Sequence, residues 1–352
     1  MTDKTLSIIV PSYNMEAYLP KCLGSLIIDD TDLLQKIDVI VVNDGSKDMT
    51  SAIAHAFEEK YPQVFTVVDK ENGNYGSCIN TALKLAKGEY VKVLDADDWF
   101  NTENLASFIV WLDEVVNREH GGCDLIFSDY DCFDERGNDT GRIRQGLPID
   151  CVFDMASVVS RSNITFMHGY TYRTKLLRDM NYHQSEGISY SDMEWIFAPA
   201  VRAKTLMYFP KVIYNYLFGR SGQTVDPRVQ AKSMEDYKKL MHSLLSTFVA
   251  ESDSATAYGH KYMFSHLRRL VNQIYRWYFI RSPRSLFDQD LHFFEKEIKT
   301  MAPDLYAEMN EWRFPNRLGL KCIKMWRRSH SFNVAIFVRA INILWTPVRK
   351  LS

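Results

Sequence analysis

The first 130 residues alternate short apolar runs, rich in β-branched residues, with amphipathic stretches. The apolar runs are nearly continuous, whereas a strand with one face in water alternates apolar and polar side chains. They therefore predict buried parallel strands, with helices between them on both faces of the sheet, a doubly wound α/β arrangement. The predicted strands are Leu6–Val10, Ile37–Val42, Val64–Val68, Tyr90–Leu94 and Leu125–Phe127.

The pattern becomes less regular after this point. Within residues 121–218, Val212–Phe218 resembles a strand and Asp192–Lys204 a helix, and we expect this half to complete the first domain. After the loop Gly219–Thr224, amphipathic helices rich in Tyr, Phe and Leu extend over Gln230–Trp312. The predicted organisation is a nucleotide-binding α/β domain over 1–226, a helical domain over 227–312 and a basic amphipathic segment over 313–352.

Composition excludes several classes of protein. A hydrophobic content of 46%, with 13% aromatic residues, argues for a folded chain rather than a disordered one. The net charge of −2 gives no global reason to bind nucleic acid. The six cysteines have no metal-ligand spacing, and no apolar run reaches the roughly 18 residues of a membrane-spanning helix. We therefore expect a reduced, cytoplasmic protein that does not cross a membrane.

The last 40 residues differ from the rest in charge, because no acidic residue follows Glu311. Apolar and aromatic side chains are interleaved with the basic ones, a combination typical of helices that lie on anionic lipid. The segment therefore predicts peripheral attachment to the inner face of the cell membrane. A packed terminal helix with a solvated basic face remains the alternative. The nine basic residues are Arg313, Arg317, Lys321, Lys324, Arg327, Arg328, Arg339, Arg349 and Lys350.

Polar turns follow three of the predicted strands. Ligands of doubly wound sheets bind beyond the carboxyl ends of the strands, so these turns are the candidate site. Asp95-Ala96-Asp97 places two carboxylates one residue apart, and carboxylate oxygens suit Mg²⁺ or Mn²⁺ that also binds substrate phosphates. Acidic residues are also common in ordinary turns, so this turn alone does not establish a metal site.

Two further turns could contact a nucleotide. Asp44 follows the second strand, where a carboxylate can accept hydrogen bonds from a ribose or a base. An ordinary strand-to-helix connection, with Ser46 or Asp48 capping the helix, remains possible. In the third turn, Gly73 and Gly76 could let the backbone approach a phosphate.

Together these segments resemble glycosyltransferase family 2, whose nucleotide-binding domain has the Rossmann-like GT-A fold with a mostly parallel central sheet. The resemblance implies an inverting transfer of a hexosyl or N-acetylhexosaminyl group from a nucleoside-diphosphate sugar, expected to be a UDP-sugar. The acceptor would be a hydroxyl of a glycan or lipid-linked molecule in bacterial polysaccharide or cell-envelope synthesis. The matching segments are residues 7–14, 41–46, 86–90 and 94–98.

The resemblance also implies roles for individual residues. Asp97 would ligate Mn²⁺ or Mg²⁺, with Asp95 near both the ribose and the metal, while Ser12 and Asp44 would contact the base and ribose. Arg220 would close on the diphosphate, although an ordinary hinge arginine is equally compatible with its position. The residues expected to bind the nucleotide are Pro11, Ser12, Tyr13, Asp44, Gly73, Asp95, Ala96 and Arg220.

The expected catalytic base is Asp192. Family members commonly carry Glu-Asp at this helix start, and here Ser191 replaces the first acid, so the role of that carboxylate is in doubt. Asp192 could instead be only a helix cap, and Glu194 could substitute as the base. His168 could reach the acceptor or the metal, or be a structural histidine among aromatic rings.

Two other functional classes compete with this interpretation. Phosphatases of the haloacid-dehalogenase type also use Asp-x-Asp, but their pattern continues to a threonine where this chain has Trp99, and it follows an earlier strand. A catalytically silent nucleotide-sugar-binding assembly protein of the same fold is a stronger alternative, because Ser191 breaks the acidic pair. The sequence indicates no oligomeric state.

Overall fold

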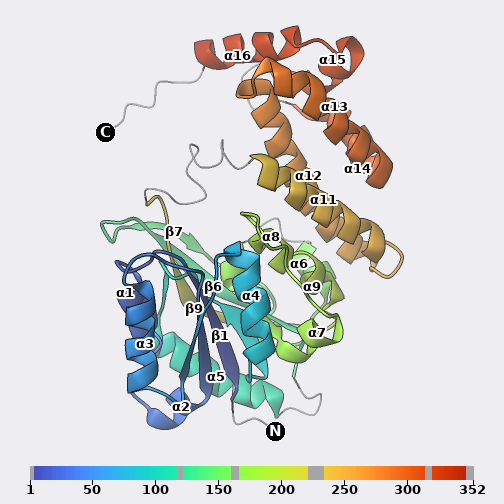
Figure 1. Ribbon diagram of the computed structural model, residues 1–352. Coiled ribbons are helices and arrows are strands. Elements are labelled where there is room, and N and C mark those ends of the chain that lie inside the picture. Colours follow the sequence, from blue (N-terminus) through green and yellow to red (C-terminus); the bar gives the residue numbers. More distant parts are fainter. Residues whose placement is uncertain (1–3, 118–121, 160–165, 221–233, 314–318, 346–352) are drawn as a thin grey trace. The chain divides into compact units, whose positions relative to one another are not determined.

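The computed structural model describes residues 4–117, 122–159, 166–220, 234–313 and 319–345. Contacts divide the chain into two compact units, one of residues 1–226 with 255–259 and the other of residues 227–254 with 260–352. Figure 1 shows the α/β unit and the helical unit.

The parallel half of the sheet follows the apolar runs. β1 pairs in parallel with β2 and β4, and β2 with β3. Every residue of β1, β2 and β4 is buried, because helices cover both faces of this part of the sheet. The predicted strands and the α/β class are confirmed, with β1 at Leu6–Ser12, β2 at Ile37–Asn43, β3 at Phe65–Asp69 and β4 at Tyr90–Val93.

The second half of the sheet is mixed. Within the described residues the strand order is β3-β2-β1-β4-β8-β6-β9-β5, with β7 paired to β6. β8 lies antiparallel between β4 and β6, and the sequence analysis did not find it because Tyr-Thr-Tyr-Arg contains no apolar run. The remaining strands are β5 (Trp99–Phe100), β6 (Leu125–Phe133), β7 (Asp139–Ile143), β8 (Tyr170–Arg173) and β9 (Leu206–Leu217).

The strand directions bring several loops to one edge. β6 and β9 are parallel to each other and antiparallel to β8, which is itself antiparallel to β4. The carboxyl ends of β1, β2, β4, β6 and β9 therefore meet at the same edge as the amino end of β8. Segments far apart in sequence thus converge there.

Helices cover both faces of the sheet. Alternate side chains of β1 (Leu6, Ile8 and Val10) pack in one cluster with residues of α1 and α5, whereas α4 contacts β1 and β2 (Figure 1). The helices of this unit are α1 (Leu19–Gly24), α2 (Thr31–Gln35), α3 (Thr50–Lys60), α4 (Asn74–Leu85), α5 (Thr102–Val116), α6 (Met155–Val159), the 3₁₀ turn η1 (Met167–Gly169), α7 (Thr174–Asp179), α8 (Asp192–Trp195) and α9 (Ala198–Arg202).

The single helix expected over Asp192–Lys204 is wrong. Two short helices, α8 and α9, occupy this stretch and are separated at Ile196 and Phe197. Pro199 lies in the first turn of α9, where its missing N–H is harmless, but in the middle of a longer helix it would remove a hydrogen bond. The proline explains the break.

The second unit is helical throughout its described residues. Its apolar side chains pack at helical spacing, with Leu240 and Leu244 of α11 and Leu267, Val271 and Ile274 of α12 all buried. Its elements are α11 (Met234–Glu251), α12 (Ala257–Ile280), α13 (Arg284–Met301), α14 (Pro303–Glu308), the 3₁₀ turn η2 (Met309–Glu311), α15 (Cys322–Ser329) and α16 (Asn333–Trp345).

Several basic side chains of the C-terminal segment point into this unit. Arg327 makes a bidentate ion pair with buried Glu295, at 2.8 and 2.9 Å, and its guanidinium lies 3.6 Å from the ring centroid of Tyr306. Arg339 donates to the carbonyl oxygens of Phe279 and Ser282 near the end of α12. These arginines therefore stabilise the helical unit and do not belong to a basic outer face.

Two more basic residues, Lys321 and Lys324, form ion pairs with Glu311. Arg328 is exposed, and Arg317, Arg349 and Lys350 lie outside the described residues. None of the helices in the described part of the chain combines the length and apolar character needed to cross a bilayer.

Candidate active site

The ends of β1 and β2 form the first part of the site. The backbone N–H of Asp44 donates to the carbonyl oxygen of Ser12 at 2.9 Å, which joins the two turns. Ser12 and Asp44 are both buried, Pro11 pairs with Val42 inside the sheet, and Tyr13 is 47% exposed. Tyr13 is thus the member of this group with an accessible ring.

The turn after β3 lies against Asp44. The carboxylate of Asp44 accepts a hydrogen bond from the backbone N–H of Gly73 at 2.9 Å and forms an ion pair with Lys70 Nζ at 2.7 Å. Lys70 also donates to Ser77 Oγ at 2.9 Å. A Cβ at residue 73 would lie 2.6 Å from Ser77 Oγ, so the close approach requires glycine. The structure thus brings together Asp44 and Gly73, and it adds Lys70, a cation at the same sheet edge that the sequence analysis did not include.

The turn after β4 carries three aspartates with different environments. Asp98 is buried and accepts two hydrogen bonds, from the Tyr214 hydroxyl at 2.5 Å and from the backbone N–H of Leu217 at 2.7 Å. Asp95 and Asp97 are partly exposed, whereas Ala96 between them is buried. Asp98 therefore ties this turn to β9, whereas Asp95 and Asp97 are less deeply buried than Asp98.

The charges of this turn are crowded. Burial, and then the neighbouring charge of Asp97, raise the pKa of Asp95 well above its usual range. Burial, and then the charges of Asp97 and Asp95, raise the pKa of Asp98 well above its usual range. Adjacent carboxylates repel one another, so a cation bound here would be stabilised by all of them. The turn has the electrostatics of a cation site.

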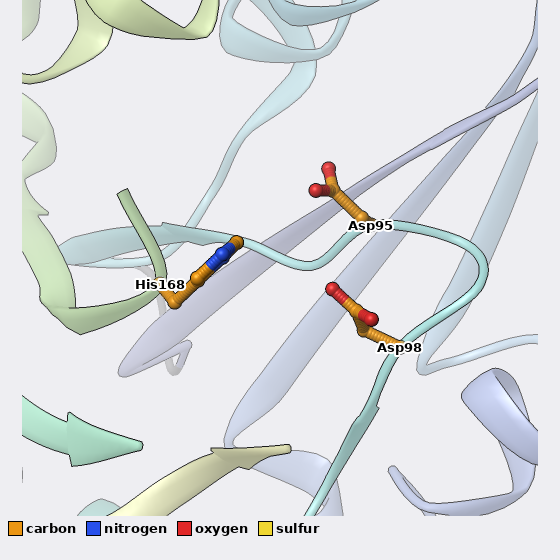
Figure 2. Close-up of side chains that lie close together, drawn as sticks. All are labelled: Asp95, Asp98 and His168. Atoms are coloured by element: carbon orange, nitrogen blue, oxygen red, sulfur yellow. The ribbon is translucent and has the colours of Figure 1, made fainter. Parts of the chain in front are cut away.

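His168 faces this turn from η1 (Figure 2). Its ring nitrogens and the carboxylates of Asp95 and Asp98 offer ligand atoms that lie within 4.8 Å of one another. The ring lies between two tyrosines, with centroids 4.6 Å from Tyr214 and 4.4 Å from Tyr216. Burial, and to a smaller extent the charge of Lys92, lower the pKa of His168 to about 3, so the imidazole is neutral. Its Nδ1 has no hydrogen-bond partner among the described residues.

A buried lysine holds the backbone of His168 by a hydrogen bond. Lys92, in the middle of β4, is fully buried, and its Nζ donates to the carbonyl oxygens of His168 at 2.7 Å and Tyr170 at 3.3 Å. Burial lowers the pKa of Lys92 to about 7. No sequence signal singled out this lysine, because its burial follows from the antiparallel pairing of β4 with β8.

The donor set fits a hard divalent cation. Carboxylates suit Mg²⁺ and Mn²⁺, and such ions keep open positions for phosphate oxygens. Two sets of ligands are possible: an inner set of Asp95, Asp98 and His168, and a set in which Asp97 is the principal ligand. Both carboxylate oxygens of Asp98 already accept hydrogen bonds, so binding an ion there would disturb the Asp98–Tyr214 contact. Asp97, which pairs with Arg220, stays the ligand predicted from the sequence, and Asp95 is common to both sets.

Arg220 forms an ion pair with Asp97. Its Nε donates to Asp97 Oδ2 at 2.8 Å, and its guanidinium lies 5.3 Å from the ring centroid of Tyr18. The structure thus brings Arg220 into the site, next to the turn after β4. It is the last described residue before the 221–233 gap.

Two residues of neighbouring elements reach the same turn. Tyr75, in the first turn of α4, donates its hydroxyl to Asp95 Oδ1 at 3.0 Å. Asp192 is close enough for its charge to raise the pKa values of Asp95, Tyr75 and Tyr216. Burial raises the pKa of Asp192 itself to about 6, although backbone N–H groups at the start of α8 lower it in part. Asp192 is therefore a carboxylate near the turn whose pKa suits proton transfer near neutral pH.

Glu194 has a different environment from Asp192. It is buried, and its two oxygens accept hydrogen bonds from the backbone N–H and the hydroxyl of Ser185, both at 2.6 Å. Ser191 is fully buried, and Gln184 Nε2 donates to its hydroxyl at 3.2 Å. Both residues thus hold the loop that precedes α8. A carboxylate at position 191 would be buried beside this loop, which gives a structural reason for serine there.

Several parts of the site belong to no recognisable sequence motif. They contact residues predicted from the sequence, and they are Tyr75, Lys70, Lys92 and the ring pair of Tyr214 and Tyr216. Tyr214 and Tyr216 are two residues apart on β9, and this spacing could have indicated that their side chains share one face of the strand.

Comparisons with known proteins bear on this site. Residues 7–131 match the family model described as Glycosyl transferase family 2. A poly(ribitol-phosphate) beta-N-acetylglucosaminyltransferase, TarS of Staphylococcus aureus, is 27% identical over 264 residues, which cover 75% of this chain and 44% of TarS. An uncharacterized glycosyltransferase of Mycoplasma pneumoniae is 36% identical over 131 residues, which cover 36% of this chain and 40% of that protein. The chain thus spans less than half the length of either relative.

Among solved structures, that of S. aureus TarS 1–349 in complex with UDP-GlcNAc is similar to this chain with a TM-score of 0.68 at 21% sequence identity. The alignment covers 96% of this chain and 90% of that one. At this identity the likeness shows a shared fold.

Proposed function

We propose that this chain, whose residues 7–131 match glycosyltransferase family 2 and whose fold is that of the GT-A structure of TarS, is an inverting, metal-dependent glycosyltransferase. The donor would be a UDP-linked hexose or N-acetylhexosamine. The acceptor would be a hydroxyl group of a glycan or lipid-linked molecule of the cell envelope.

One observation carries this proposal. Asp95 and Asp97 lie in the turn at the carboxyl end of β4, and the carboxylate of Asp192 is close enough for its charge to add to the effects of burial and Asp97 that raise the pKa of Asp95. A single-displacement transfer needs a group that binds the leaving diphosphate and a base on the acceptor side. These carboxylates supply both.

Each residue of the site would have its own role in the transfer. Asp44 and Ser12 would bind the base and ribose at the ends of β1 and β2, and Asp97 and Asp95 would hold the metal. The bound ion would supply positive charge that stabilises the departing diphosphate. Asp192 accepts the proton of the acceptor hydroxyl as its oxygen attacks the anomeric carbon. Arg220 would exchange its ion pair with Asp97 for one with the diphosphate.

A panel of nucleotide sugars tests this function. With Mn²⁺ present, we expect release of UDP from a UDP-hexose or UDP-N-acetylhexosamine, by transfer or by slow hydrolysis, and no release in EDTA. UDP-N-acetylglucosamine is the first donor to test, because it is bound in the TarS structure. If calorimetry detects UDP binding but no donor of the panel reacts, the catalytically silent assembly protein becomes the better interpretation.

We also propose that the helical unit binds an anionic membrane surface, through a smaller face than the sequence suggested. Ile336 and Phe337 of α16 are 52% and 46% exposed, and Met325 of α15 is 37% exposed. Arg328, also on α15, is exposed. Exposed apolar side chains with a basic neighbour can insert between anionic head groups. Arg327 and Arg339 contribute only indirectly, by holding the helices together.

Vesicle sedimentation measures this association. The double variant Ile336→Glu/Phe337→Glu should bind vesicles that contain phosphatidylglycerol less than the wild type does. Val249→Glu, at a position 50% exposed on α11, is the matched control and should bind normally. Salt should weaken wild-type binding, since each basic residue near the surface contributes roughly 1 kcal/mol that is screened over about a Debye length. Equal sedimentation of the double variant and the wild type would refute the proposal.

A further inference from the structure

A row of aromatic rings leads outward from the acidic turn. Tyr214, Tyr216 and Phe218 are two residues apart at the end of β9, so their side chains share one face of the strand. The pairing continues past the strand, since the backbone N–H of Phe218 donates to the carbonyl oxygen of Phe133 at 2.7 Å. Tyr214 is buried with its hydroxyl on Asp98, whereas Phe218 is 50% exposed. The row therefore runs from the turn to solvent.

A second exposed ring joins this row through His168. Phe166 is 59% exposed, and its ring centroid is 6.2 Å from that of His168. His168 stacks on Tyr216, which lies 6.1 Å from Phe218. A single exposed aromatic side chain is normal on a protein surface. Here two of them flank one stacked His168–Tyr216 pair, and His168 offers a ring nitrogen to the group that contains Asp95.

The position of this row separates it from the nucleotide. Ser12 and Asp44 lie at the ends of β1 and β2, on one side of β4, whereas η1 and β9 lie on the other side in the strand order. Burial and the charges of the acidic turn, with a smaller contribution from Asp192, raise the pKa of Tyr216, so the row adjoins the acidic turn. A molecule that contacts Phe166 and Phe218 would lie on the β9 side of this turn, away from the predicted nucleotide contacts.

We propose that Phe166 and Phe218 form an acceptor subsite that binds the apolar face of a pyranose ring. This inference rests on the proposed function and names its acceptor class as a cyclic saccharide. A β-glucopyranoside has a flat face of axial C–H bonds, which packs on aromatic rings, and binding sites typically combine such rings with a few polar groups. An acyclic polyol, such as the ribitol in the name of the relative TarS, has no such face.

Saturation-transfer NMR on the full chain with bound UDP and Mg²⁺ tests the subsite, with methyl β-D-glucopyranoside and ribitol as probes. We expect transfer to the axial protons of the pyranoside and much less transfer to ribitol. Phe166→Ala and Phe218→Ala should each weaken pyranoside binding roughly three- to tenfold, whereas Phe218→Trp should preserve it. Phe293→Ala, at a position 69% exposed in the helical unit, is the matched control and should behave as the wild type.

Calorimetry with UDP separates the two levels of the proposal. If UDP binds but the pyranoside receives no transfer, or if neither alanine variant weakens it, the subsite is wrong and the glycosyltransferase assignment stands. Equal contact with ribitol would overturn the acceptor class. If UDP does not bind with a divalent cation present, the proposed function fails and the subsite with it.

Discussion

Asp97→Asn is expected to weaken UDP binding in the presence of Mn²⁺ by at least about 10- to 100-fold, the range seen when even outer partners of a metal site are removed. Asp97 is partly exposed and forms an ion pair with Arg220, and its carboxylate would turn to a metal when that guanidinium moves to the diphosphate. The neutral amide of asparagine is a poorer ligand for a hard cation. Isothermal titration calorimetry with Mn²⁺ and with EDTA measures the loss.

Asp98→Asn is the matched variant for this experiment. Its carboxylate accepts hydrogen bonds from Tyr214 and Leu217, and an amide oxygen can retain one of them. We therefore expect a stability loss of at most about 1–3 kcal/mol and nearly normal Mn²⁺-dependent UDP binding. If Asp98→Asn abolishes binding and Asp97→Asn does not, the ion belongs to the inner set of Asp95, Asp98 and His168. Equal UDP affinity with Mn²⁺ and EDTA in the wild type would remove the metal from the mechanism.

Asp192→Asn is expected to lower kcat by about 10²–10⁴-fold, the usual contribution of a general base, while UDP affinity stays nearly unchanged. The base acts on the acceptor hydroxyl, and the nucleotide contacts lie at β1, β2 and β4. The N-cap of α8 is Ser191, so the cap role considered for Asp192 is wrong, and a structural role is limited to hydrogen bonds that its carboxylate accepts from backbone N–H groups at the start of α8. An asparagine oxygen can accept these bonds, so a structural role predicts little change in this variant. Steady-state kinetics together with UDP calorimetry separates the two roles.

The pH profile of the wild type provides a second readout. Burial raises the pKa of Asp192 to about 6, so its carboxylate is protonated and inactive as a base below that pH. Activity should therefore rise with pH through about 6, and this limb should disappear in the residual activity of Asp192→Asn. A profile that is flat from pH 5 to pH 8 would contradict the assignment.

Glu194→Gln is the control for the same segment. Because both oxygens of Glu194 accept hydrogen bonds from Ser185, we expect this change to lower the free energy of unfolding by about 1–3 kcal/mol and to leave the acidic limb of the pH profile in place. If Glu194→Gln abolished the limb and Asp192→Asn kept it, Glu194 would be the base.

The position of Asp192 also bears on the missing acid of the family pair. Ser191 is buried against Gln184, while the charge of Asp192 is among the causes that raise the pKa values of Asp95 and Tyr75. Residue 191 therefore holds the loop, and residue 192 acts on the acidic turn through its charge. The loss of an acid at position 191 does not by itself make the protein catalytically silent.

The sequence by itself determined the parallel half of the sheet and the acidic turn. Strands such as Leu6–Ser12 and Ile37–Asn43 are buried on both faces, so nearly all of their residues must be apolar, and that requirement is visible without a structure. The carboxyl end of a parallel strand places its next residues at the ligand-binding edge, which is why Asp44, Asp95 and Asp97 could be selected in advance.

Only the tertiary structure decided which polar groups hold the fold and which remain accessible. Asp98 and Glu194 resemble Asp97 and Asp192 in the sequence, but Asp98 is satisfied by the distant strand β9 and Glu194 by the loop before α8. Arg327 belongs to a basic run, yet it is paired with Glu295, 32 residues earlier. Apolar periodicity is a local property, whereas the partner of a charge depends on which segments the fold brings together.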